Sequence, residues 1–87
     1  MKNKHHAMQF PVEFPIKVMG LNTETFPSTI KEIFRKHVNS DEIAYTSQPS
    51  SSDKYISITA IFTAQSREQL DALYQELNDH QLVLMTL

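Results

Sequence analysis

The chain has 87 residues and a mass of 10.0 kDa, which is the size of one small domain. Its hydrophobic share of 40% is enough for one packed core, and its net charge of −2 gives no general attraction to nucleic-acid phosphates. The absence of cysteine excludes disulfides, thiolate metal sites and cysteine nucleophiles. No apolar run approaches the roughly 20 residues that cross a bilayer, so we expect a cytoplasmic protein without a membrane segment.

The first residues carry no structural signal. Residues 1–9 show no hydrophobic periodicity, and we expect them to form a flexible N-terminus ahead of a single domain spanning 10–87. His5 and His6 are compatible with a native segment or with the remnant of an expression tag, and the fold prediction does not use them.

The first regular element is a strand that ends at the only glycine. Phe14, Ile16 and Val18 alternate with other side chains, which predicts a strand ending near Gly20. At that position the chain must turn toward a helix, where the permissive φ of glycine is most useful.

A helix is predicted over residues 24–38. Asn22, Thr23 and Thr25 offer oxygens that could cap its first turn. The apolar side chains recur at helical spacing and form one stripe: Phe26, Ile30, Ile33, Phe34 and Val38.

Two strands joined by a polar turn follow. Residues 43–48 form the weaker strand, which Pro49 should stop, and residues 50–54 form the turn. Residues 55–64 alternate with strict period two, as expected for a strand with one buried face.

The chain closes with a second helix and a short strand. Ser66 and Gln69 have the spacing of a capping box, which predicts the start of a helix over 67–78. Residues 82–87 read as an apolar strand, whose periodicity does not say which side chains face inward.

The order β-α-β-β-α-β favours an α+β fold. Two β-α-β units joined by a hairpin predict a ferredoxin-like two-layer sandwich with both helices on one face of a four-stranded antiparallel sheet. The first and third strands should be central and the second and fourth should lie at the edges.

The other face of this sheet has no layer to cover it. It should carry a mixture of polar and apolar side chains: Lys17, Met19, Tyr55, Ser57, Thr59 and Ile61. This face is a candidate partner surface, although an ordinary polar face with stray apolar residues would look the same.

Catalytic motifs are missing from the sequence. The histidines do not occur at metal-ligand spacing, and Ser50, Ser51 and Ser52 belong to a turn rather than to a nucleophile elbow. The segment after Gly20 lacks the glycines and lysine of a phosphate-binding loop. We therefore expect a protein that is not an enzyme and uses no metal or cofactor. Tyr55 is the one aromatic residue expected on the open face, which argues against nucleic-acid binding.

Three segments resemble a known family. The motif FPxxFPIKVMG at residues 10–20, the segment PSSSDKYISIT at 49–59 and the pattern LxxLYxEL at 70–77 are similar to the YbeD-like family of small bacterial proteins. The resemblance runs from residue 10 to residue 87 and leaves residues 1–8 unmatched.

The resemblance implies an ACT-like fold and brings no catalytic residues. ACT-like domains hold small effectors near the loop after the first strand, usually across a dimer interface. The matching candidate ligand-binding residues here are Gly20, Leu21, Asn22 and Thr23. The loop lacks the Asp and the Pro-Gly of the usual ACT pattern, so the resemblance does not specify an amino acid as effector. Some relatives are encoded beside lipoate-attachment genes, which implies a regulatory role there.

Two functions remain open at this stage. The first is a regulatory or adaptor domain that acts through contacts with a protein partner, linked to lipoate metabolism. The alternative is an ACT-like sensor of a small metabolite. A homodimer is compatible with both.

Overall fold

The computed structural model describes residues 8–87, so His5, His6 and most of the predicted flexible N-terminus lie outside the described residues. Its strands and helices follow the predicted order, with one short 3-10 helix added after the first α-helix. The elements are β1 (Val12–Leu21), α1 (Thr25–His37), η2 (Ser40–Glu42), β2 (Ala44–Pro49), β3 (Tyr55–Ala64), α2 (Arg67–Asp79) and β4 (Val83–Thr86).

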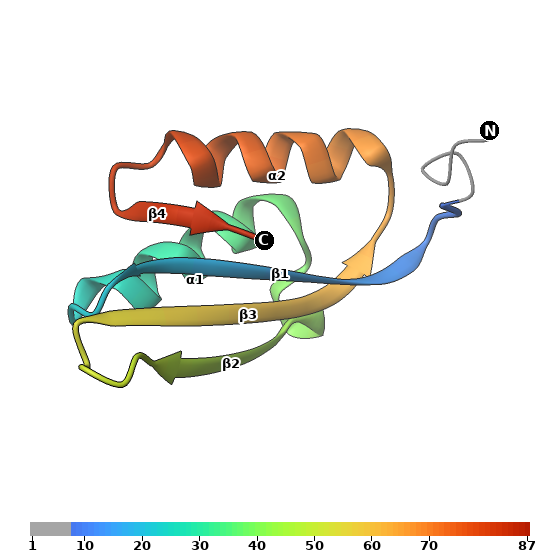
Figure 1. Ribbon diagram of the computed structural model, residues 1–87. Helices are drawn as coiled ribbons and strands as arrows, with labels where there is room; N and C mark the ends of the chain where they lie inside the picture. Colours follow the sequence, from blue (N-terminus) through green and yellow to red (C-terminus); the bar gives the residue numbers. More distant parts are fainter. Residues whose placement is uncertain (1–7) are drawn as a thin grey trace, which may run out of the picture.

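The four strands form one antiparallel sheet in the order β2-β3-β1-β4, with the two helices alongside it (Figure 1). The central strands β1 and β3 pair without interruption from Val12 opposite Ala64 to Leu21 opposite Tyr55. The predicted ferredoxin-like βαββαβ sandwich is therefore confirmed, including the central position of the first and third strands.

The core lies between the helices and one face of the sheet. Aromatic rings connect the two layers: the centroids of Phe34 and Phe62 are 5.9 Å apart, and those of Phe34 and Tyr45 are 6.1 Å apart. Burial of this apolar surface is the main source of stability for a domain of this size. The fully buried large side chains come from both helices and from β1 and β3: Phe26, Phe34, Phe62, Ile16, Ile30, Ile58, Leu73, Leu77 and Val18.

Gly20 is required for space rather than for an unusual backbone angle. The sequence predicted a permissive φ at this position, but the described part of the chain holds no glycine with positive φ, so that prediction is wrong. A β-carbon on Gly20 would overlap the ring of Phe26 and would lie 2.6 Å from the carbonyl oxygen of Leu82. The absence of a side chain lets β1, α1 and the segment before β4 come together.

The two helices begin differently. The N-cap residue of α1 is Glu24, which makes no side-chain capping bond, so the predicted capping by Asn22, Thr23 and Thr25 is wrong. The predicted N-cap of α2 is confirmed, because Oγ of Ser66 accepts a hydrogen bond from the backbone N–H of Gln69 at 3.0 Å.

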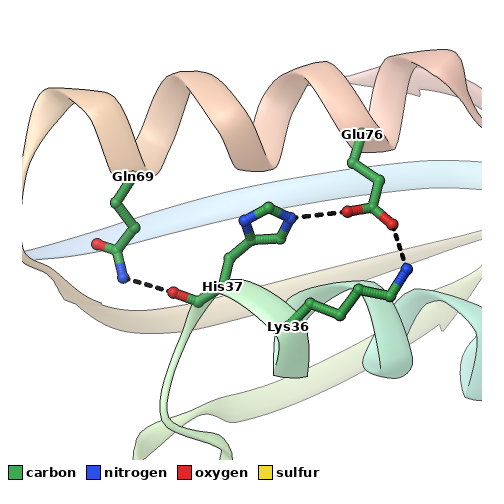
Figure 2. Close-up of polar contacts among 4 residues, drawn as sticks. All are labelled: Lys36, His37, Gln69 and Glu76. Atoms are coloured by element: carbon green, nitrogen blue, oxygen red, sulfur yellow. Dashed lines mark hydrogen bonds and ion pairs between the residues drawn. The ribbon is translucent and has the colours of Figure 1, made fainter.

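The C-terminal end of α1 is tied to α2 by side-chain contacts (Figure 2). Both oxygens of Glu76 are used, with Nζ of Lys36 at 2.6 Å and Nε2 of His37 at 2.7 Å. Nε2 of Gln69 donates to the carbonyl oxygen of His37 at 2.7 Å, which satisfies one of the free carbonyls of the last helical turn. These bonds fix the spacing of the helices at the edge of the core.

Candidate functional site

The strand register places all six residues of the predicted partner surface on the sheet face away from the helices. Lys17 lies opposite Thr59, and Met19 lies opposite Ser57. Side chains two positions apart along a strand share a face, so Tyr55 and Ile61 join them on β3. We call this side of the sheet the open face. On it Lys17, Tyr55 and Ile61 are exposed, whereas Met19, Ser57 and Thr59 are half-buried.

The open face carries more apolar surface than the sequence indicated. Met85 of β4 is paired with Met19 and is 49% exposed, and Leu87 is 64% exposed. Leu21, opposite Tyr55, is 48% exposed. These neighbours form one apolar cluster of Met19, Leu21, Tyr55, Met85 and Leu87. The residues from the C-terminal strand were missed because periodicity alone did not orient that strand.

β4 carries a bulge that explains this difficulty. The register with β1 shifts between Met19, opposite Met85, and Gly20, opposite Val83, so strict alternation fails at Leu84. The ladder then continues past β4, because the backbone groups of Lys17 and Leu87 exchange two hydrogen bonds of 3.2 and 2.8 Å. These two hydrogen bonds hold Leu87 beside Lys17.

A hollow of about 330 Å³ lies at the hairpin end of the open face. Four of the predicted surface residues line it together with the end of β2 and the start of the hairpin turn. Its lining residues are Lys17, Met19, Gln48, Pro49, Ser50, Ser51, Tyr55, Ile56 and Ser57. Thr59 and Ile61 are on the same face but outside this lining.

The hairpin that borders the hollow is held by local hydrogen bonds. The backbone N–H of Ser50 donates to the carbonyl of Tyr55 at 2.8 Å, and Oγ of Ser50 accepts from the N–H of Tyr55 at 3.2 Å. Oγ of Ser57 donates to the carbonyl of Gln48 at 3.3 Å. The ammonium group of Lys54 lies 5.6 Å from the centroid of the Tyr55 ring, within reach of a cation–π interaction.

The predicted ligand-binding loop lies next to the hairpin. Asn22 joins the two segments, because its backbone N–H donates to the carbonyl of Lys54 at 2.9 Å and its side-chain amide to that of Asp53 at 3.1 Å. Gly20 is buried, whereas Leu21, Asn22 and Thr23 are exposed. These four residues border the hairpin but do not line the hollow.

The contact between His37 and Glu76 is a carboxylate–histidine pair that the sequence did not reveal, since the residues are 39 positions apart. Hydrogen bonding to Lys36, and then to His37, holds the pKa of the Glu76 carboxyl below its usual value of 4.5. The same contact raises the pKa of Lys36. Because both partners of the carboxylate come from the end of α1, the arrangement serves to join the helices.

Two general tests give negative results within residues 8–87. No three histidine, aspartate or glutamate side chains lie close enough together there to hold a metal ion. No helix in that part of the chain is both long and apolar enough to cross a membrane.

Comparison with protein families identifies residues 5–87 with a model described as "Protein of unknown function (DUF493)". The chain belongs to this DUF493 family. A UPF0250 protein from Chromobacterium violaceum is 38% identical over 85 residues, which cover 97% of this chain and 96% of that protein. A second UPF0250 protein, from Nitrosomonas europaea, is 36% identical over 81 residues, which cover 92% of this chain and 93% of that protein. The YbeD-like resemblance is thus confirmed.

The DUF493 match begins earlier in the chain than the family resemblance described from the sequence. It starts at residue 5 rather than residue 10, so His5 and His6 fall inside the matched region. The family match thus includes residues 5–9 as well, and the domain boundary at residue 10 stays a prediction.

Solved structures share the fold of this DUF493 protein. The solution structure of protein HP0495 from H. pylori matches with a TM-score of 0.70 and 17% identity, covering 92% of this chain and 85% of that one. The ACT domain of GTP pyrophosphokinase from Chlorobium tepidum matches with a TM-score of 0.64 and 14% identity, covering 86% and 94%. The ACT-like character of the fold is confirmed.

Proposed function

We propose that this protein is a non-enzymatic regulatory or adaptor domain of the bacterial cytoplasm that acts by binding a protein partner through the open face. The observation that carries the proposal is the apolar cluster around Met19, in which Leu21, Met85 and Leu87 each expose about half or more of their surface on the same face of the sheet. Contiguous exposed apolar surface of this kind is typical of interaction sites. The link to lipoate metabolism remains a prediction from the family resemblance.

The apolar cluster is suited to protein contact in a second respect. It extends onto the edge strand β4, and an edge strand has backbone groups available for pairing with another chain. A partner could therefore bury side chains of the cluster and also bond to the backbone beside them.

Affinity capture followed by direct titration of the purified partner tests this proposal. Met19→Lys and Tyr55→Ala should weaken binding at least about tenfold, because truncating or charging a central interface residue commonly costs more than 1 kcal/mol. Asp71→Ala, on the exposed side of α2, is the matched control and should bind like the wild-type protein. Equal binding by all four proteins would overturn the assignment of this face.

A second candidate function is an ACT-like metabolite sensor at Gly20, Leu21, Asn22 and Thr23. The two hydrogen bonds from Asn22 to the hairpin favour it, since a ligand at this loop would be coupled to the border of the open face. A panel of amino acids, nucleotides and lipoyl compounds should contain one that raises the melting temperature. No shift with any of them would count against sensing.

A further inference from the structure

The hollow on the open face has a chemical character of its own. Its lining of nine residues contains one charged side chain, that of Lys17. Ser51, Tyr55 and Gln48, which carry hydroxyl and amide groups, line the same hollow. All four side chains can donate hydrogen bonds, so the hollow is electropositive and rich in donors.

Among the described residues, these donors have no side-chain bonding partner. Within residues 8–87, Lys17 takes part in neither of the ion pairs, and no side-chain hydrogen bond is made by Gln48, Ser51 or the Tyr55 hydroxyl. Ser50 and Ser57, in contrast, use their hydroxyls within the hairpin. The hollow thus consists of a hydrogen-bonded frame and a set of donors that have no side-chain partner among the described residues.

One wall of the hollow is apolar. Met19 contributes an aliphatic side chain and Tyr55 contributes its ring, and both residues belong to the open face. A ligand that fits both parts needs an oxygen-bearing anionic group beside a compact apolar or aromatic group. The volume of about 330 Å³ lies at the small end of the range for small-molecule sites.

The frame around the hollow is also fixed before any ligand arrives. The hairpin is closed by the bonds between Ser50 and Tyr55, and Asn22 holds its turn from the neighbouring loop. A preorganised site loses less entropy on binding than a loop that must order first.

We propose that this hollow binds a small amphipathic oxyanion, a carboxylate or a phosphate monoester attached to a compact apolar group, with Lys17 as its counter-ion. The site would give metabolite sensing, the second candidate function, a ligand class and a location different from the loop of residues 20–23, which borders the hollow without lining it. It does not depend on protein contacts. Lys17 supplies the charge, Ser51 and Gln48 supply hydrogen bonds, and Met19 and the ring of Tyr55 contact the apolar part.

The test is a titration followed by amide NMR shifts at low salt, with benzoate and phenyl phosphate as probes and neutral benzamide as their control. Benzoate, phenyl phosphate or both should shift Lys17, Ser51, Tyr55 and Ser57, and the stronger probe distinguishes a carboxylate site from a phosphate site. Inorganic phosphate, which lacks the apolar group, should bind more weakly. Added salt should weaken binding, because the Lys17 ammonium is exposed.

Two lysine variants give the decisive comparison. Lys17→Gln should weaken binding of the anionic probe at least about tenfold, as expected for loss of a charged hydrogen bond. Lys31→Gln should leave it unchanged, because Lys31 is likewise exposed but lies outside the hollow, with its ammonium group over the ring of Tyr45. Both variants should fold, which thermal unfolding will verify.

Three outcomes would overturn the proposal. They are no localised shifts with either anion, equal shifts with benzamide, or unchanged binding by Lys17→Gln. Met85→Lys separates this result from the protein-contact proposal, since Met85 belongs to the apolar cluster but not to the lining of the hollow. It should weaken partner binding and spare the anionic probe.

Discussion

The ring of Phe26 occupies the space that a β-carbon on Gly20 would need. Gly20 is in a central strand and Phe26 is fully buried in the first turn of α1. The contact therefore sets how closely the first helix approaches the sheet. It also explains why the only glycine of the chain lies here although its φ is not positive.

Gly20→Ala should destabilise the protein by about 1–3 kcal/mol, the usual cost of overpacking a core. Both obstacles, the Phe26 ring and the backbone carbonyl of Leu82, must move to admit the methyl group. Chemical denaturation measures the loss. Thr23→Ala, in the exposed loop nearby, is the control and should change little.

A second substitution tests the cause. Combining Gly20→Ala with Phe26→Leu removes the ring that the new methyl group meets, so the double variant should lose less stability than the sum of the single variants. Strict additivity would show that the ring is not the obstacle.

Glu76 should contribute stability that depends on pH. Its carboxyl pKa is lowered in the folded state by Lys36 and His37, so the contribution is complete above the unfolded value near 4.5 and is lost as pH falls through the folded value. Glu76→Gln should therefore lower the melting temperature by roughly 2–4 °C at pH 7. The difference from wild type should shrink when the pH is brought below 4.5.

Asp71→Asn is the matched control for this effect. Asp71 is also on α2 but lies beyond its first turn, is exposed and forms neither of the ion pairs of the described residues. Its melting curve should follow that of the wild-type protein at every pH. A gap between Glu76→Gln and wild type that persists unchanged at low pH would contradict the electrostatic explanation.

Gln69 should contribute more to the stability of the fold than its position on a helix surface indicates. Its side-chain oxygen accepts from the N–H of Gln65 at 2.7 Å, and its nitrogen donates to the carbonyl of His37 at 2.7 Å. Gln69→Ala loses both bonds and should cost about 1–2 kcal/mol in unfolding experiments.

Gln69→Glu separates the two bonds. A carboxylate can still accept from Gln65 but cannot donate to His37, so this variant should lose stability through the contact between the helices alone. Wild-type stability in Gln69→Glu would show that the bond to His37 carries no weight.

The backbone of Asp53, in the turn of the hairpin, lies in the left-handed region, with φ of 62°. Asp53→Gly should preserve or raise stability, whereas Asp53→Ala should be lower by about 1 kcal/mol relative to the glycine variant, because a β-carbon is unfavourable at this angle. The same pair of substitutions at Ser52, which lacks a positive φ, is the control. Thermal unfolding of the four variants distinguishes these outcomes.

Local patterns predicted most of the fold. The strand over 55–64 has the bounds of β3, and the helices over 24–38 and 67–78 agree with α1 and α2 within one residue at each end. These segments have strong periodicity, and their buried stripes are the ones that face the core. The weaker signals failed where partners distant in sequence decide the outcome. The first helix has no side-chain cap, and Gly20 is required by the Phe26 ring and the Leu82 carbonyl rather than by a turn.

The candidate site was predicted in part. Lys17, Met19, Tyr55, Ser57, Thr59 and Ile61 share the open face because their alternation along two strands already fixed their side of the sheet. Met85 and Leu87 were missed because periodicity did not orient β4, whose alternation a bulge at Leu84 interrupts near the start of the strand. The hollow was missed because it is made by a turn and three strands together.

Length, composition and charge by themselves predicted one small domain with one core, excluded disulfides within the chain, and gave no reason to expect general affinity for nucleic-acid phosphates. Hydrophobic periodicity added the order of elements and the inner face of the central strands, since both depend on neighbours along the chain. Only the tertiary structure decided that Gly20 leaves room for the Phe26 ring and the Leu82 carbonyl, and which side of β4 is exposed. It also decided that Lys17 lines a hollow together with donors that are unpaired among the described residues. These features depend on register and on contacts between distant segments, so no local pattern encodes them.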